Sequence, residues 1–152
     1  MTNAAPLFLI DTNVLIYAYD AADPAKQGRA VDVLIAVHDT RSGALSVQVL
    51  GEFYYNITRK PKVPLTREQA SATAIRLSRS WRVLDLNVRT FLDAVRAASQ
   101  HQMSYWDALI WATASQWDIR NVVSEDQQDG RLIENVRFIN PFQPSFDMAR
   151  LA

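Results

Sequence analysis

Four acidic residues stand where the predicted elements of this chain begin or end. Asp11 and Asp126 each follow a short apolar run that is typical of a buried strand. Glu52 and Asp107 lie in the first turns of predicted helices. Singly, each has an ordinary explanation as a helix cap, a first-turn acid or a turn residue. Gathered at one edge of a fold, four carboxylates would raise one another's pKa unless cations lay between them, so their convergence would require a metal ion.

The ligand chemistry favours Mg²⁺ or Mn²⁺ for such a site. Sites built only from oxygen atoms suit hard ions that keep several waters and bridge to phosphate. Zinc is disfavoured because the chain has no cysteine, and its two histidines, His38 and His101, are not in HExxH spacing. Both histidines are more simply explained as residues at helix C-termini that complement the helix dipole. A metal-free nuclease built on a histidine pair has no support in this spacing.

The elements that must position these acids alternate along the sequence. Strands are predicted at 7–10, 44–47, 81–86, 121–124 and 137–139, and helices at 22–37, 49–59, 66–77, 88–100 and 104–117. Two helix starts are marked by capping signals, Asp23 followed by Pro24 and Thr66 with Gln69 three residues on. The alternation predicts a three-layer α/β/α sandwich with a mostly parallel central sheet. Ligands of such sheets bind beyond the carboxyl ends of the strands, which is where the acids are expected.

Composition indicates one globular domain. The chain has 152 residues, of which 49% are hydrophobic and 21% charged, enough to bury a core without disulfides. No repeat, low-complexity tract or linker divides it, so we expect a single domain over 1–152 with a core of about 7–142 and a short C-terminal tail. The apolar run 7–10 is too short for a signal peptide, and no segment reaches the length of a membrane span. Together with the absence of cysteine, this is compatible with a cytoplasmic location.

The charges are balanced overall but unevenly distributed. Sixteen Lys and Arg residues match sixteen Asp and Glu residues, so no global field draws the protein to nucleic acid or to a membrane. Residues 59–100 nevertheless hold nine basic and three acidic residues. Arg59, Lys60 and Lys62 follow the helix that carries Glu52 and are candidates for contacts with the phosphates of a nucleic acid. The other arginines of this segment are interpreted as solvated helix faces.

The aromatic residues have two interpretations. Tyr105, Trp106, Trp111 and Trp117 lie on one predicted helix, where packing in the core or at a dimer interface explains them better than stacking on bases. Tyr54 and Tyr55, beside Glu52, have a somewhat better claim to line a groove that binds nucleic acid.

Several short motifs occur together in a particular order. They are Asp11-Thr12-Asn13 after a strand, Ser46 with Glu52 six residues on, Tyr105-Trp106-Asp107-Ala108, and Ser124-Glu125-Asp126 ahead of Gly130 and Asn140-Pro141-Phe142. In this order and spacing they resemble the PIN domain over about residues 7–142. More narrowly, the small size and lack of other domains are similar to the VapC-type toxins of bacterial toxin-antitoxin pairs.

The resemblance implies a metal-dependent ribonuclease in which one or two Mg²⁺ or Mn²⁺ ions are held by Asp11, Glu52, Asp107 and Asp126. Asp11 and Asp107 would be the principal ligands. The fourth position is ambiguous between Asp126, which matches the motif best, and Glu125 or Asp129. Residues that would hold the acids or waters in place are Thr12, Asn13, Ser46 and Ser124, although Asn13 and Ser124 also suit ordinary turns. The implied partners are RNA, a cognate antitoxin that inserts a segment into the acidic cleft, and a second copy of the chain.

Two other functions remain open on the sequence. An aspartate-based phosphoryl-transfer or receiver-type domain would use Asp11 as a nucleophile. Such sites usually have a second acid beside the first and a lysine in the later half, whereas position 13 is Asn and the lysines are Lys26, Lys60 and Lys62. A non-catalytic RNA-binding PIN domain would keep the fold and need no metal.

Overall fold

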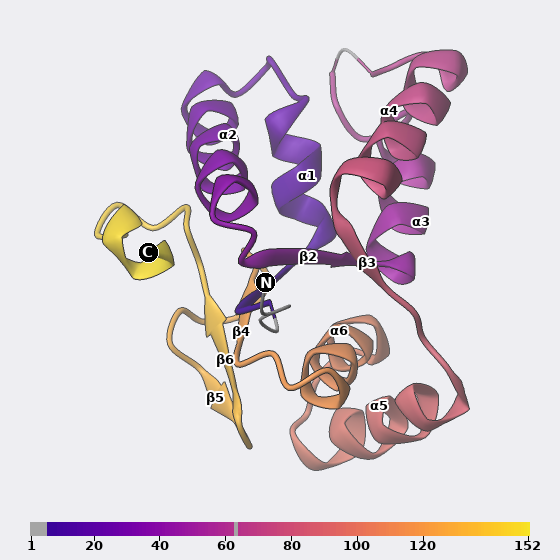
Figure 1. Ribbon diagram of the computed structural model, residues 1–152, viewed down its shortest axis with the longest axis vertical. Helices are drawn as coiled ribbons and strands as arrows, with labels where there is room; N and C mark the ends of the chain where they lie inside the picture. Colours follow the sequence, from indigo (N-terminus) through magenta and orange to yellow (C-terminus); the bar gives the residue numbers. More distant parts are fainter. Residues whose placement is uncertain (1–5, 63) are drawn as a thin grey trace.

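The computed structural model describes residues 6–62 and 64–152, and it confirms the predicted three-layer α/β/α architecture (Figure 1). The strands are β1 (Phe8–Ile10), β2 (Gly43–Ser46), β3 (Arg82–Leu84), β4 (Asn121–Val123), β5 (Leu132–Ile133) and β6 (Val136–Ile139). The helices are α1 (Thr12–Ala18), α2 (Pro24–Asp39), α3 (Val47–Asn56), α4 (Arg67–Ser80), α5 (Val88–Gln100) and α6 (Tyr105–Gln116), with a terminal 3₁₀ helix, Met148–Leu151.

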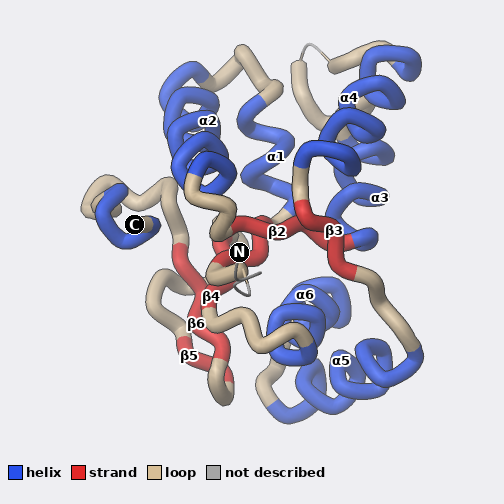
Figure 2. Tube along the Cα trace, in the orientation of Figure 1, coloured by secondary structure: helices blue, strands red, loops and turns tan. Residues whose placement is uncertain are grey.

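The sheet is parallel except at one edge. Its strand order is β3-β2-β1-β4-β6-β5, and only the β5–β6 pair is antiparallel. The tube in Figure 2 shows these strands as one twisted layer between the helices. From β1 the chain adds β2 and β3 on one side, and it later places β4 and β6 on the other side. The order therefore reverses between β1 and β4, which is the topological switch point at which open α/β sheets bind ligands.

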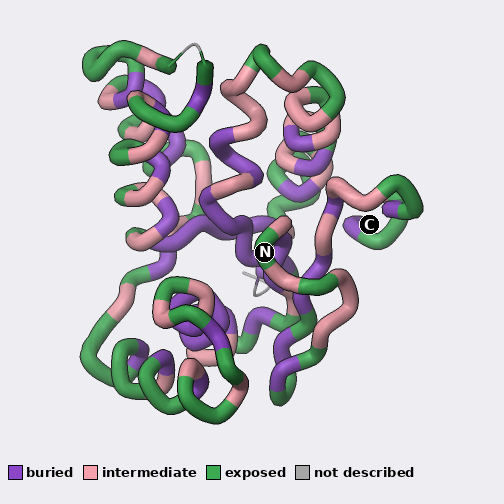
Figure 3. The backbone as a smooth tube through the Cα atoms, turned by 180° about the vertical axis from the view of Figure 1, so that it is seen from behind, coloured by how far each residue is buried: buried purple, intermediate pink, exposed green. Residues whose placement is uncertain are grey.

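Helices cover both faces of the sheet. In Figure 1, α1 to α4 lie above it and α5 and α6 lie below it. α5 and α6 pack against each other, and α6 contacts β4 and β6. The strands and α6 form the buried centre, purple in Figure 3, with Leu9, Ile10 and Trp111 almost wholly enclosed. No helix within the described residues is both long and apolar enough to cross a membrane.

The capping signals read from the sequence are confirmed. The Asp23 side chain accepts a hydrogen bond from the Lys26 amide at the start of α2, with Pro24 as its first residue. The Thr66 hydroxyl accepts from the Gln69 amide, and the Gln69 side chain accepts from the Thr66 amide, which closes a capping box at α4. Local chemistry therefore sets these two boundaries.

Three elements were missed by the sequence interpretation, and a fourth was displaced. α1 was not predicted, because a seven-residue helix is too short to show periodicity, and its stability comes from packing against α2 and α3. The two-residue strand β5 and the terminal 3₁₀ helix were also missed. α3 begins at Val47 and ends at Asn56, earlier than predicted, because the Ser46 hydroxyl caps it by accepting from the Val49 amide.

Candidate active site

The site forms where β1 and β4 end side by side. These parallel strands pair in the register Ile10 with Val123, so the residues that follow each strand emerge together. The Asp11 amide then donates to the Val123 carbonyl at 2.9 Å, which continues the pairing by one residue. The sequence order therefore brings Asp11 and the segment Ser124-Glu125-Asp126 to the same point, although more than a hundred residues separate them.

Three carboxylates converge there. Asp11, Asp107 and Asp126 each offer an oxygen atom, and these oxygens all lie within 4.8 Å of one another. Asp11 caps α1, Asp107 lies in the first turn of α6, and Asp126 lies in the loop after β4. Their burial differs, since Asp11 is buried, Asp107 is partly exposed and Asp126 is exposed. The group is thus open to solvent on one side and anchored in the protein on the other.

Asp11 is the buried member, with only 4% of its surface exposed. Its Oδ1 accepts from the Thr12 amide at 2.7 Å, and its Oδ2 accepts from the Ser124 hydroxyl at 2.6 Å. The Asn13 amide group lies at 3.5 Å from Oδ2. Burial raises the pKa of Asp11 to about 7, against the lowering effect of the Ser124 hydrogen bond and with smaller contributions from the charges of Asp126 and Glu52.

Asp126 and Asp107 are fixed by neighbours in the same loop. The Asp126 amide donates to Ser124 Oγ at 3.1 Å, and the Gln127 side chain donates to Asp107 Oδ2 at 2.9 Å. Although the residue as a whole is exposed, desolvation of its carboxyl group by the surrounding protein, and next the charge of Asp107, raise the pKa of Asp126. Burial, together with the neighbouring negative charges, therefore favours a proton or a cation at Asp11 and Asp126.

Glu52 lies beside this group but does not belong to it. Its Oε2 accepts from the Thr12 hydroxyl at 3.1 Å, and its Oε1 accepts from the Gln48 side chain at 2.6 Å. Glu52 nonetheless lines both cavities that contain Asp11 and Asp126. Two hydrogen bonds hold the carboxylate at the wall of the site, facing the same solvent as the three aspartates.

Two further residues predicted from the sequence, Asp129 and Ser46, are not hydrogen-bonded to the three aspartates in the part of the chain that the structure describes, and have other partners. Asp129, the alternative fourth acid, accepts from the Asn140 amide at 2.8 Å and pairs with Arg150 at 3.2 Å. Although burial acts the other way, these contacts hold the pKa of Asp129 below its ordinary value. Ser46 caps α3 and has no hydrogen bond to the acids among the described residues.

The three basic candidates have different environments. Lys60 lines a cavity of about 350 Å³ together with Asp11, Glu52 and Asp126, and its charge acts to lower the pKa of Asp126. The Arg59 guanidinium instead stacks on the Tyr55 ring, 4.0 Å from its centroid. Lys62 is exposed and does not line that cavity. Of the three, Lys60 is the one placed beside the carboxylates.

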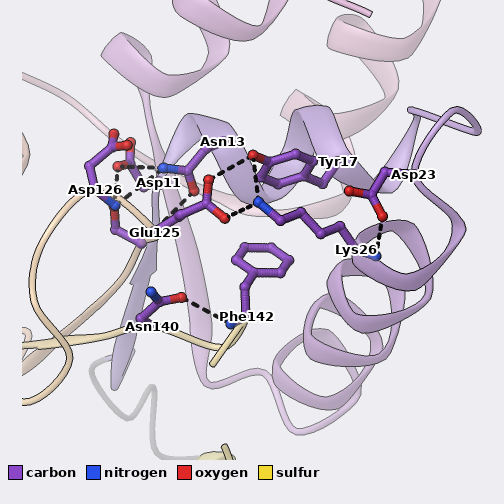
Figure 4. Close-up of polar contacts among 10 residues, drawn as sticks. Asp11, Asn13, Tyr17, Asp23, Lys26, Glu125, Asp126, Asn140 and Phe142 are labelled. Carbon is purple, nitrogen blue, oxygen red and sulfur yellow. Dashed lines mark hydrogen bonds and ion pairs between the residues drawn. The ribbon is translucent and has the colours of Figure 1, made fainter. Parts of the chain in front are cut away.

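A polar cluster next to the site was not anticipated from the sequence (Figure 4). Lys26 Nζ on α2 lies 2.5 Å from Glu125 Oε2, and the Tyr17 hydroxyl donates to Glu125 Oε1 at 2.6 Å. The Glu125 amide donates to the Asn13 side chain at 3.4 Å. These contacts hold Glu125 away from the three aspartates and fix the loop that carries Asp126. Lys26 lies in no local motif, so only the pairing of α2 with the β4 loop reveals it.

The helix that carries Asp107 places its tryptophans in unlike surroundings. Trp111 is 1% exposed and its Nε1 donates to the Ile133 carbonyl at 3.1 Å, in agreement with the predicted core role. Trp106 is 60% exposed and lines a cavity of about 380 Å³ that also contains the aspartates. Trp106 therefore does not pack in the core, and of the two expectations for it only the dimer interface stays a prediction.

Comparison with known proteins identifies the fold. A family model described as "PIN domain" matches residues 8–134. Among solved structures, the VapC20 toxin of Mycobacterium tuberculosis, described as Sarcin-Ricin loop cleaving, is 24% identical, with a TM-score of 0.61 over 76% of this chain and 86% of that one. The DNA-bound VapBC of Salmonella typhimurium is 17% identical, with a TM-score of 0.62 over 88% and 96%. A toxin-antitoxin complex from Klebsiella pneumoniae is 16% identical, with a TM-score of 0.61 over 89% and 98%. No curated protein sequence matches this chain.

Proposed function

Because this chain belongs to the PIN domain family, we propose that it is a divalent-metal-dependent ribonuclease and the toxin of a toxin-antitoxin pair. The observation that carries the proposal is the convergence of Asp11, Asp107 and Asp126, whose oxygens lie within 4.8 Å of one another. An aspartate-based phosphoryl-transfer domain is less well supported, because the family match and the triad both favour the nuclease.

The residues present fit a hard divalent ion. All three groups offer carboxylate oxygens, which Mg²⁺ and Mn²⁺ prefer, and no nitrogen or sulfur ligand is in the cluster. The most buried of them, Asp11, is held by hydrogen bonds that keep its oxygens oriented even without an ion. Burial that raises the pKa of a carboxylate also makes a neighbouring cation more favourable, because the charge is then compensated. Asp11 and Asp107 are the proposed principal ligands, with Asp126 and Glu52 completing the site or orienting waters.

The protein's own groups then have distinct tasks in hydrolysis. A divalent ion, when bound, supplies the positive charge that lowers the pKa of a nearby water and offsets charge on the phosphate. Ser124, Thr12 and Asn13 hold the carboxylates in place. Lys60 provides a cation beside the acids to which an RNA phosphate can bind.

The toxin role rests on the solved structures that this chain resembles. One is a toxin-antitoxin complex from Klebsiella pneumoniae, and VapBC2 of Rickettsia felis and FitAB are each bound to DNA. By analogy we expect a cognate antitoxin that covers the acidic cleft, a homodimer of this chain, and action on RNA in the cytoplasm. Mg²⁺ is the expected ion in the cell, with Mn²⁺ able to replace it.

The decisive test pairs two isosteric substitutions, one in the first turn of α6 and one just after its end. Asp107→Asn removes a charge from the triad, whereas Asp118→Asn removes an exposed charge just beyond the far end of α6, at a left-handed φ of 57° that asparagine tolerates. We expect Mg²⁺ or Mn²⁺ to support RNA cleavage by the wild type and by Asp118→Asn. Asp107→Asn should lose at least about 100-fold, as expected when a metal ligand is removed, and chelator should abolish cleavage by every form.

Two results would reject the nuclease assignment. One is cleavage by Asp107→Asn at the wild-type rate, and the other is cleavage that persists in chelator. The toxin role is tested with the same pair, since induced expression should arrest bacterial growth for Asp118→Asn but not for Asp107→Asn. Growth that is insensitive to the wild-type protein would separate the toxin role from nuclease activity.

A further inference from the structure

The three aspartates lie between two cavities of different character. Asp11, Glu52, Asn56 and Asp126 line both of them. The first, of about 350 Å³, is polar and contains Lys60 and Tyr17. The second, of about 380 Å³, is flanked by the aromatic rings of Tyr55 and Trp106. A polymer whose phosphate lies at the carboxylates therefore meets a lysine on one side and aromatic surface on the other.

Trp106 is unusual among the tryptophans of α6. It directly precedes Asp107, and 60% of its surface is exposed, compared with 1% for Trp111 and 37% for Trp117. Neighbours nevertheless fix its position. The Tyr105 ring packs edge-on against it at 5.0 Å between centroids, and the Gln48 side chain donates to its backbone carbonyl at 3.2 Å. A large aromatic surface is thus held in place beside the acids while remaining accessible to a ligand.

Tyr55 brings a second exposed ring to the same cavity from α3. It is 59% exposed, and the Arg59 guanidinium lies 4.0 Å from its centroid. Isolated apolar residues are common on protein surfaces and need no explanation. Here, however, two exposed rings from different helices line one cavity next to the carboxylate triad, and one of them lies beside an arginine. Together they form a surface suited to a planar group carried by a negatively charged polymer.

We propose that this cavity is a base-stacking subsite, which takes an unpaired nucleobase next to the scissile phosphate on Trp106 and Tyr55. The inference rests on the proposed ribonuclease function and adds to it two side chains that would contact a base of the RNA. A base inside a duplex is stacked on its neighbours and offers no free face, whereas splayed bases of single strands stack on aromatic side chains. Such stacking does not depend on which base is present, because every base has a π-face.

The two halves of the cleft then divide the recognition of RNA. Lys60 binds the charged backbone, which carries no sequence information. Trp106 requires that the adjacent base be free. The competing explanation for this surface is a dimer in which a second copy of the chain covers Trp106. In that case, removal of the Trp106 ring would not change the affinity of a protomer for RNA.

The test measures cleavage of a single-stranded RNA 12-mer of randomised sequence, and of the same pool annealed to its complement, in Mn²⁺. Trp106→Leu keeps an apolar side chain but removes the ring, Trp106→Phe keeps a ring, and Trp117→Leu is the control at the other end of α6. Loss of the stacking contact with one base should raise KM about 5- to 150-fold in Trp106→Leu. The value of kcat and the Mn²⁺ concentration for half-maximal rate should stay unchanged, Trp106→Phe should recover most of the affinity, and the duplex should resist cleavage by the wild type.

Three outcomes overturn the subsite. They are a wild-type KM in Trp106→Leu, equal cleavage of duplex and single strand, and dissociation of a dimer by Trp106→Leu without change in KM. The last of these assigns the surface to self-association. Absence of cleavage by the wild-type protein in either ion is a different result, since it rejects the proposed function itself and the subsite with it. Because Trp106 is largely exposed, its variants should keep the melting temperature of the wild type, which thermal unfolding verifies.

Discussion

Replacement of Asp11 by asparagine should stabilise the metal-free protein above neutral pH while removing its affinity for a divalent ion. Asp11 is 4% exposed, and burial raises its pKa from an ordinary 3.8 to about 7. Between these two values the folded protein keeps a proton that the unfolded chain releases. The stability that comes from this group is therefore complete below pH 3.8 and is lost as pH rises towards 7.

The magnitude follows from the size of the shift. One pKa unit corresponds to about 1.4 kcal/mol, so a shift of roughly three units amounts to about 4 kcal/mol of unfolding free energy between pH 4 and pH 8. Asparagine has nearly the same shape and never ionises, so Asp11→Asn keeps this amount, about 4 kcal/mol of unfolding free energy, when the pH is raised from 4 to 8. Its NH₂ group takes the place of one carboxylate oxygen, so one acceptor for the hydrogen bonds from Ser124 and Asn13 is lost. This loss lowers the unfolding free energy by about 1 kcal/mol. At pH 8 the variant should therefore be more stable than the wild type by about 3 kcal/mol.

Guanidinium denaturation in chelator, followed by the intrinsic fluorescence of the four tryptophans, measures this difference at pH 5, 6, 7 and 8. Addition of Mn²⁺ at pH 8 should then stabilise the wild type but not Asp11→Asn, because only the folded wild type binds the ion. Asp129→Asn is the control of opposite sign, since the pKa of Asp129 is lowered and its ionised form stabilises the fold. Parallel pH profiles for the wild type and Asp11→Asn would refute the reasoning, as would a wild type that is the more stable at pH 8 in chelator.

Two further predictions concern the support of the site and the core. Lys26→Met removes the ion pair with Glu125 and frees the loop that carries Asp126, so it should raise the Mn²⁺ concentration for half-maximal cleavage about 10-fold, while Lys26→Arg should restore it. Equal Mn²⁺ dependence in the wild type and Lys26→Met would contradict a positioning role for this pair. Trp111→Ala should lower the unfolding free energy by about 3–5 kcal/mol in denaturant titrations, because it leaves a cavity and an unpaired carbonyl at Ile133. A loss below about 1 kcal/mol would show that Trp111 does not anchor α6 to the sheet.

Local sequence signals were sufficient for much of the fold. The Thr66 and Gln69 side chains complete a capping box with backbone groups within three residues, so no distant part of the chain is needed to place the start of α4. The alternation of apolar runs and helical periods gave the class of the fold for a similar reason, because strand and helix periods are properties of short segments. α1 escaped this method because its seven residues gain their stability from α2 and α3, which the local pattern does not contain.

The acids themselves were found by a rule of topology, but their arrangement was not. Residues after parallel strands emerge at one edge of the sheet, which identified Asp11 and Asp126 as neighbours. Strand order decided the rest, since β1 lies directly beside β4 and carries Asp11 to Ser124. The order also separates Asp129, which pairs with Arg150, from the triad, and places Glu52 against Thr12.

The orientation of α6 likewise depends partly on local periodicity and partly on tertiary packing. At 3.6 residues per turn, Trp106 and Trp111 point about 140° apart, so their spacing alone places them on different faces of the helix. Which face meets the sheet depends on how α6 packs on β4 and β6, and the structure buries Trp111 and leaves Trp106 beside the acids. The pairing of Lys26 with Glu125 across 99 positions was likewise set only by tertiary contact. Periodicity and capping act through bonds a few residues long, whereas a catalytic site depends on surfaces that meet after the chain has folded.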